Sequence, residues 1–244
     1  MAVDAIVAAK ASMLMDMARL ERIGQNLTNL TTPGYRREVV IATPFLAALG
    51  KGVGTLSAVN RQSLEAQLQV VRDMRSGTMS RTGNPFDLAL DAGVYLEVAG
   101  PGGTLYAKGG SLRQDALGRL VTGQGHVVLA EGGDIRLTRD DFSVGRDGRV
   151  MEGNRPVGQL RLVRIDEEAL LRYIGNGLYQ PSAATATQLA REGVRQGYLE
   201  LSNVSHAGEM VRLMETTRHF ETSQRVVMGY MSMVDTAMDV LGSF

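Results

Sequence analysis

Apolar residues recur every seven positions at both ends of the chain, and this spacing is the strongest pattern in the sequence. The N-terminal line comprises Ile6, Met13, Leu20 and Leu27, with Ala9, Met17, Ile23 and Leu30 in the intervening turns. The C-terminal line comprises Leu213, Phe220, Val227, Val234 and Leu241, flanked by Met210, Met214, Met231 and Met238. Sustained sevens are typical of helices that pair along a narrow seam. They predict helices over residues 3–30 and 203–241, roughly 42 Å and 58 Å long at 1.5 Å per residue.

The middle of the chain has a different pattern, in which short apolar runs alternate with turn residues about every ten positions. Turn pairs such as Pro101-Gly102, Gly132-Gly133 and Asp147-Gly148 separate the runs. The runs cover residues 86–99, 104–110, 118–130, 134–151 and 155–165. This spacing predicts an antiparallel β domain, either a sandwich or barrel-like.

The order of these patterns predicts an α+β fold with an antiparallel β domain inserted between two long terminal helices. Because the chain leaves through one helix and returns through the other, the helices should lie antiparallel and resemble a coiled coil. The expected parts are an N-terminal helical segment (1–49), a linker (50–82), a central β domain (83–182) and a C-terminal segment with the long helix (183–244). Gly50–Gly54 and residues 175–182 are the expected joints.

The methionines allow two interpretations. Ten of the 13 lie in residues 1–31 or 203–244, so they could fill the core between the two helices. Alternatively, a second apolar flank of the C-terminal helix contacts other molecules, for which unbranched, polarizable methionine is well suited. We favour the second interpretation, because this helix has more apolar flank than one partner can cover.

Composition excludes several classes of function. The 26 basic and 26 acidic residues cancel, whereas a nucleic-acid-binding protein normally carries a basic excess. No apolar run is long enough to span a membrane, and the N-terminus lacks the features of a secretory signal. We therefore expect neither nucleic acid nor direct membrane insertion. The absence of cysteine removes disulfides and thiolate chemistry.

Residues that could carry chemistry do not form a convincing site. His126, His206 and His219 lack metal-ligand spacing, and His219 is expected to pair with Glu215 one turn away. The adjacent carboxylates at 140–141 and 167–168 should point apart. Arginines at 36, 37, 61, 72, 75 and 81 predict a solvated basic face, with contact to an acidic neighbouring subunit as the alternative. No catalytic residue, cofactor or metal is predicted.

Two terminal motifs and the central runs together carry a resemblance. "NLTNLTTPGYRRE" (26–38) and "YLELSNVSHAGEMVRLMETTRHFETSQRVV" (198–227) resemble the terminal signatures of the flagellar basal-body rod and hook family. "TGNPFDLALDAGVYLEV" (82–98) is similar to the family's β domain. The residues that match include Asn26, Asn29, Thr32, Gly34, Tyr35, Asn203, Glu209 and Met210.

The resemblance implies a structural subunit of the periplasmic rod of the flagellar basal body. Its terminal helices would pack with other rod proteins and with copies of itself in a helical assembly, after export by the flagellar export apparatus without a cleaved signal. Among the subtypes, a proximal-rod protein is favoured over a distal-rod protein. Asn26, Asn29 and Thr32 would cap a crowded helix end, and Gly34 would turn the chain outward in a left-handed conformation. The rival classes are a soluble coiled-coil adaptor and a cell-wall hydrolase.

Overall fold

The computed structural model describes residues 2–42, 68–139, 141–166, 171–175, 177–181 and 188–242. The expected joint at 50–54, Arg61 and the carboxylates at 140 and 167–168 lie outside these residues. The chain divides into two compact units. The first comprises residues 1–28, 38–73 and 205–244, and the second comprises residues 29–37 and 74–204.

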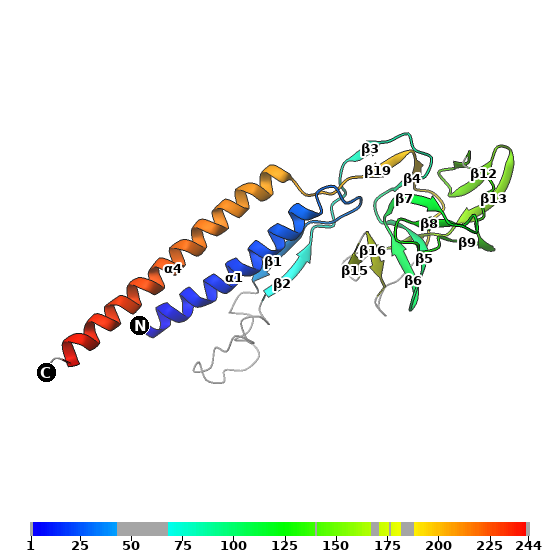
Figure 1. The fold of residues 1–244 in the computed structure, drawn as a ribbon. Coiled ribbons are helices and arrows are strands. Elements are labelled where there is room, and N and C mark those ends of the chain that lie inside the picture. Colours follow the sequence, from blue (N-terminus) through cyan, green and yellow to red (C-terminus); the bar gives the residue numbers. More distant parts are fainter. Residues whose placement is uncertain are drawn as a thin grey trace. The chain divides into compact units, whose positions relative to one another are not determined.

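The first unit is built from two helices and a two-stranded ribbon. Helices α1 (Ala2–Thr28) and α4 (His206–Gly242) lie side by side and run in opposite directions (Figure 1). Strands β1 (Glu38–Ala42) and β2 (Leu68–Arg72) pair antiparallel, and β1 packs on α1. The Ser205 hydroxyl caps α4 by accepting a hydrogen bond from the Gly208 N–H at 3.3 Å. None of the described helices has the apolar length needed to cross a bilayer.

The second unit consists of antiparallel sheets. A six-stranded sheet has the order β15-β16-β6-β5-β14-β17, a five-stranded sheet β10-β9-β13-β12-β11, and a four-stranded sheet β18-β4-β7-β8. Strand β19 pairs with β3 in a separate ribbon. The bounds are β3 Met79–Arg81, β4 Asp87–Leu90, β5 Val94–Gly100, β6 Gly103–Ala107, β7 Gly109–Gln114, β8 Leu120–Thr122, β9 Leu129–Glu131, β10 Gly133–Asp134, β11 Ser143–Val144, β12 Arg149–Glu152, β13 Arg155–Leu160, β14 Leu162–Arg164, β15 Arg172–Gly175, β16 Leu178–Gln180, β17 Gln188–Leu189, β18 Val194–Gln196 and β19 Tyr198–Glu200.

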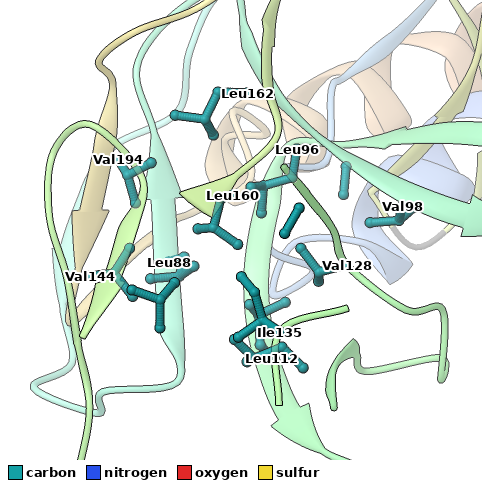
Figure 2. Packing of buried hydrophobic residues seen from close by; sticks show 14 of the residues in the cluster. Leu88, Leu96, Val98, Leu112, Val128, Ile135, Val144, Leu160, Leu162 and Val194 are labelled. Carbon is teal, nitrogen blue, oxygen red and sulfur yellow. The ribbon is translucent and has the colours of Figure 1, made fainter. Parts of the chain in front are cut away.

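The core of the second unit lies where strands from these sheets face each other. Leu88, Leu96, Leu160 and Val128 are fully or almost fully buried there (Figure 2). The predicted turn pairs separate strands as expected. Pro101-Gly102 joins β5 to β6, and Asp147-Gly148 joins β11 to β12. Gly148 has a φ of 82°, a conformation that glycine adopts without strain.

The α+β class with antiparallel sheets agrees with the prediction, and each predicted apolar run contains at least one strand. The sequence did not indicate β1 and β2 or the short strands β15–β19. These are two to five residues long, and several of them pair with partners distant in sequence, such as β18 with β4. The domain bounds at residues 83 and 182 stay a prediction, and β17–β19 lie beyond the second of them.

Two expectations for the helices were wrong. Met17 was counted among the apolar residues that fill the turns of the N-terminal pattern, but its side chain is 54% exposed, whereas its neighbour Asp16 is 1% exposed. His219 contacts Asp16 at 2.5 Å, so its partner lies on the other helix and is not Glu215. A search for apolar residues favours Met17 over Asp16. The folded chain buries Asp16 because the imidazole of His219 can pair with its carboxylate.

Candidate assembly site

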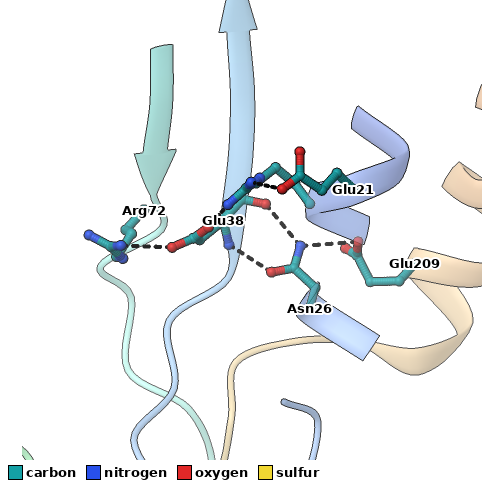
Figure 3. A network of polar contacts seen from close by, with 6 residues as sticks. Glu21, Asn26, Glu38, Arg72 and Glu209 are labelled. Atoms are coloured by element: carbon teal, nitrogen blue, oxygen red, sulfur yellow. Dashed lines mark hydrogen bonds and ion pairs between the residues drawn. The ribbon is translucent and has the colours of Figure 1, made fainter. Parts of the chain in front are cut away.

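The end of α1 is held by a buried asparagine. The Asn26 side chain donates from Nδ2 to the Glu38 carbonyl at 2.9 Å, and its Oδ1 accepts the Glu38 N–H at 2.9 Å (Figure 3). The amide thus satisfies both backbone groups of the first residue of β1. Nδ2 also donates to Glu209 Oε2 at 3.2 Å. A single side chain therefore ties α1 to β1 and to the first turn of α4.

The carboxylate of Glu38 extends this network to β2. It accepts a hydrogen bond from Arg72 Nη2 at 2.7 Å and another from Arg22 Nη1 at 3.2 Å. Arg22 also pairs with Glu21 on the helix surface (Figure 3). Glu209, which is completely buried, accepts a hydrogen bond from Arg212 at 2.6 Å. The buried carboxylates thus have cationic or amide partners, as low-dielectric surroundings require.

The glycine of the N-terminal motif makes the predicted turn in the second unit. Gly34 has a φ of 68°, which confirms the expected left-handed conformation. Its N–H donates to the Glu200 carbonyl at 2.9 Å. A Cβ at this position would lie 3.4 Å from Cβ of Lys108. The turn therefore combines a backbone conformation that favours glycine with a close neighbour.

The residues after Gly34 pair with the C-terminal motif. The Tyr35 carbonyl accepts the Asn203 N–H at 3.3 Å, and the buried Tyr35 ring meets Tyr173 edge-on at 6.0 Å between centroids. Asn203 Oδ1 accepts the Arg37 N–H at 2.7 Å, and its Nδ2 donates to the Arg75 carbonyl at 2.8 Å. The two motifs are thus bound together through the backbone.

A buried ion pair completes this contact. Arg36 Nη1 lies 2.5 Å from Glu200 Oε1, and both side chains are 1% exposed. The same oxygen accepts the Gly77 N–H at 2.9 Å. Burial works against the charge on Arg36, but the hydrogen bond and negative charge of Glu200 outweigh it and raise the pKa of Arg36. The expectation of a solvated face was wrong for Arg36. The signal that could have identified the pair is charge: Arg36 is positive in the N-terminal motif, and Glu200 is negative in the C-terminal motif.

The remaining predicted motif residues make local contacts. Asn29 accepts the Thr32 N–H at 3.2 Å through its carbonyl, and its Oδ1 accepts the Thr32 hydroxyl at 3.1 Å. These bonds form the turn that precedes Pro33. They stabilise the exit from α1 within one chain.

The predicted heptad positions are half-buried where their side chains are described. This holds for Ile6, Met13, Leu20 and Leu27 on α1, and for Met210, Leu213, Phe220, Val227 and Val234 on α4. The side chain of Leu241 lies outside the described residues. A second set of large apolar side chains on α4 is exposed, namely Val211, Met214, Val226, Met228, Met231, Met233 and Met238.

Comparison with known proteins shows the family of the chain. A family model described as "Flagellar basal body rod FlgEFG protein C-terminal" matches residues 195–240. The flagellar basal-body rod protein FlgF of Caulobacter vibrioides is 30% identical over 228 residues, which cover 91% of each chain. The chain belongs to the flagellar basal-body rod protein family. The resemblance seen in the terminal motifs is thereby confirmed.

Members of two subtypes of this rod family are similar to the chain. FlgF of Mesorhizobium japonicum is 29% identical over 242 residues, covering 97% of each chain. FlgG of Bacillus subtilis is 29% identical over 232 residues, covering 86% of this chain and 88% of that protein. Identity alone therefore does not separate the two subtypes.

The family match to the C-terminal region includes the contacts described above. Residues 195–240 contain Glu200 and Asn203, which hold the N-terminal motif in the second unit. They also contain Glu209, which bonds Asn26, and most of α4. In this rod protein, the C-terminal motif thus has a function within the single chain, because it holds the N-terminal motif in place.

Proposed function

We propose that the chain is a structural subunit of the flagellar rod, of the FlgF type in the proximal rod, and that it has no enzymatic activity. The distal-rod FlgG type is the alternative. The nearly complete mutual coverage with an FlgF protein favours the first subtype. The terminal helices would form a coiled-coil-like pair and pack against other rod proteins and further copies of this chain, after export by the flagellar apparatus.

The observation that carries this proposal is the uncovered apolar surface of α4. Met231 and Met238 lie seven residues apart, as do Val226 and Met233, and all four side chains are more than half exposed. These lines flank the half-buried line that includes Val227 and has the same spacing. Helices with several heptad lines can pack against more than one neighbour. We refer to these four residues as the flank residues.

Burial of the flank residues would favour assembly. Complete burial of a methionine or valine side chain is worth about 1.5–3 kcal/mol, so covering the exposed part of each would contribute on the order of 1 kcal/mol. The flank residues lie on both sides of one seam, so successive subunits would use different surfaces of the same helix. Such heterologous contacts generate an open helical assembly when the rotation from one subunit to the next does not close a ring.

Two adjacent substitutions test the proposal. Met231→Asp places a charge among the flank residues, and Ser232→Asp places the same charge at the next exposed position of α4. Because both positions are exposed, neither variant should lose the fold of the single chain. Each variant would be expressed in a motile bacterium in place of its own subunit, and its amount in purified basal bodies would be compared with the amount exported.

Met231→Asp should be exported but largely absent from basal bodies, whereas Ser232→Asp should be incorporated like the parent protein. Equal incorporation of the two variants would exclude the flank residues as an assembly surface. If the parent chain instead forms a closed oligomer of fixed size in solution, the coiled-coil adaptor class would replace the rod subunit.

A further inference from the structure

The seam between α1 and α4 contains a buried carboxylate at a heptad position. Asp16 lies seven residues after Ala9 and seven before Ile23, so these three residues form a second seven-residue line on α1. Its side chain is 1% exposed. A charge in an otherwise apolar seam lowers stability unless it is paired. Polar residues at such positions are known to specify how helices align.

The two partners of Asp16 differ in whether their contact with it depends on the packing of α1 against α4. Arg19 Nη1 lies 3.4 Å from Oδ1, but Arg19 belongs to α1 and moves with Asp16. His219 Nδ1 lies 2.5 Å from Oδ2 and belongs to α4. The imidazole comes from the exposed edge of the seam, since the His219 side chain is 58% exposed. Only the contact with His219 therefore depends on how α1 lies along α4.

A second polar contact between the helices lies ten residues away. Asn26 bonds Glu209, and both residues are ten positions from the Asp16–His219 pair along their own helices. The two contacts thus belong to one antiparallel register. The Asn26 contact fixes the register of the two helices at one point. It does not determine which face of α4 the distal half of α1 follows. A second point removes that freedom.

Opposite the distal half of α1, apolar residues of α4 lie on more than one seven-residue line. The flank residues have the same seven-residue spacing as the half-buried line, and His219 itself lies on the line of Val226 and Met233. Met238 lies beyond the start of α1 in this register, but movement of α1 toward Met231 would cover that side chain. It would also carry Asp16 away from His219 and leave the buried carboxylate without its partner on α4.

We propose that Asp16 and His219 select the face of α4 along which α1 lies, and so keep Val226, Met231 and Met233 uncovered by α1. The pair determines the specificity of helix packing at a cost in stability. Because the contact is made within one chain, this inference does not depend on the assignment to the rod.

The absence of cysteine allows the arrangement to be measured with pairs of nitroxide labels on introduced cysteines. A distal pair at the exposed positions Lys10 and Arg225 reports on the distal half of α1. A proximal pair at Gly24 and Val211, also exposed, reports near Asn26 and serves as the internal control. Distances would be recorded by pulsed electron paramagnetic resonance in the full chain carrying Asp16→Leu.

Asp16→Leu should broaden or split the distal distance distribution by roughly 5–10 Å, the displacement expected when a helix moves to an adjacent face at an interaxial distance of 8–10 Å. The proximal distribution should stay narrow. Thermal unfolding of the helices should shift to higher temperature, since a buried charge has been removed. Asp16→Asn, which can still bond His219, and the exposed control Glu21→Leu should both keep a narrow distal distribution.

Two results would overturn the inference. One is a distal distribution in Asp16→Leu as narrow as that of the parent chain, which would show that the apolar seam selects the face without the polar pair. The other is loss of helix signal in Asp16→Leu, which would make Asp16 a stabilising residue and not a specificity determinant.

Discussion

Replacement of Gly34 by alanine tests whether the turn needs a glycine for its left-handed backbone conformation or whether Gly34 is simply a tolerated loop residue. Gly34 has a φ of 68°, and an L-residue in the left-handed region costs about 1–2 kcal/mol. The added Cβ itself would lie 3.4 Å from Cβ of Lys108, which is ordinary van der Waals contact. The strain is therefore expected to come from the backbone.

A second glycine provides a matched control in the same unit. Gly102 lies in an exposed turn, has no neighbour within 4 Å of an added Cβ, and lacks a left-handed φ. Both substitutions reduce the conformational entropy of the unfolded chain by the same amount. The difference between Gly34→Ala and Gly102→Ala should therefore be about 1–2 kcal/mol, the cost of the left-handed conformation.

Urea unfolding followed by tyrosine fluorescence measures this difference. Six of the seven tyrosines lie in the second unit, so the signal reports mainly on that unit. With a urea dependence of about 2 kcal/mol per M, the midpoint of Gly34→Ala should lie about 0.5–1 M below that of Gly102→Ala. Equal midpoints would refute the role of the left-handed conformation.

Valine at the same position should affect assembly as well. Its branched Cβ adds crowding against the backbone and Lys108, and the total cost should be about 2–3 kcal/mol. Gly34→Val should be exported but poorly incorporated into basal bodies, because export handles unfolded chain. Incorporation equal to that of the parent protein would contradict this expectation.

Three further predictions concern other contacts. Asn26→Leu removes one of the partners of buried Glu209 and both bonds to the Glu38 backbone, so thermal unfolding of the helices should show a loss of about 2–4 kcal/mol; an unchanged midpoint would contradict the network. Phe220→Asp places a charge at a half-buried seam position, and both the helix signal and incorporation into basal bodies should fall; normal motility would show that the seam tolerates water there. Hydrogen bonds from the Thr138 hydroxyl and backbone lower the pKa of Glu152 from its ordinary value of 4.5, so its stabilising effect should be present above that value and disappear as the pH falls through the lower folded-state pKa; a stability difference between parent and Glu152→Gln that does not narrow with acidification would refute it.

The parts of the fold set by local sequence were predictable. The pair Asp147-Gly148 marks a turn between strands because glycine there adopts a positive φ, and the seven-residue lines located both helices. The left-handed turn at Gly34 followed from the same conformational argument.

The contacts between the two ends of the chain were not predictable in the same way. Arg36 and Glu200 are 164 residues apart, and a lone arginine in a basic stretch is typical of a solvated surface. Asp16 was missed because Met17 beside it is apolar and a carboxylate was not expected on the line of Ala9 and Ile23, and its partner His219 lies on the other helix. The sequence identified Asn26 and Glu209 as motif residues, but it did not indicate that they bond to each other.

A density map of an intact basal body containing this chain tests the rod-subunit proposal most directly. The account predicts that Met231 and Met238 on one side of α4, and Val226 and Met233 on the other, contact helices of neighbouring subunits, while Asp16 remains opposite His219 within the chain. A map in which these four side chains face solvent and the β strands make the contacts between subunits would contradict it.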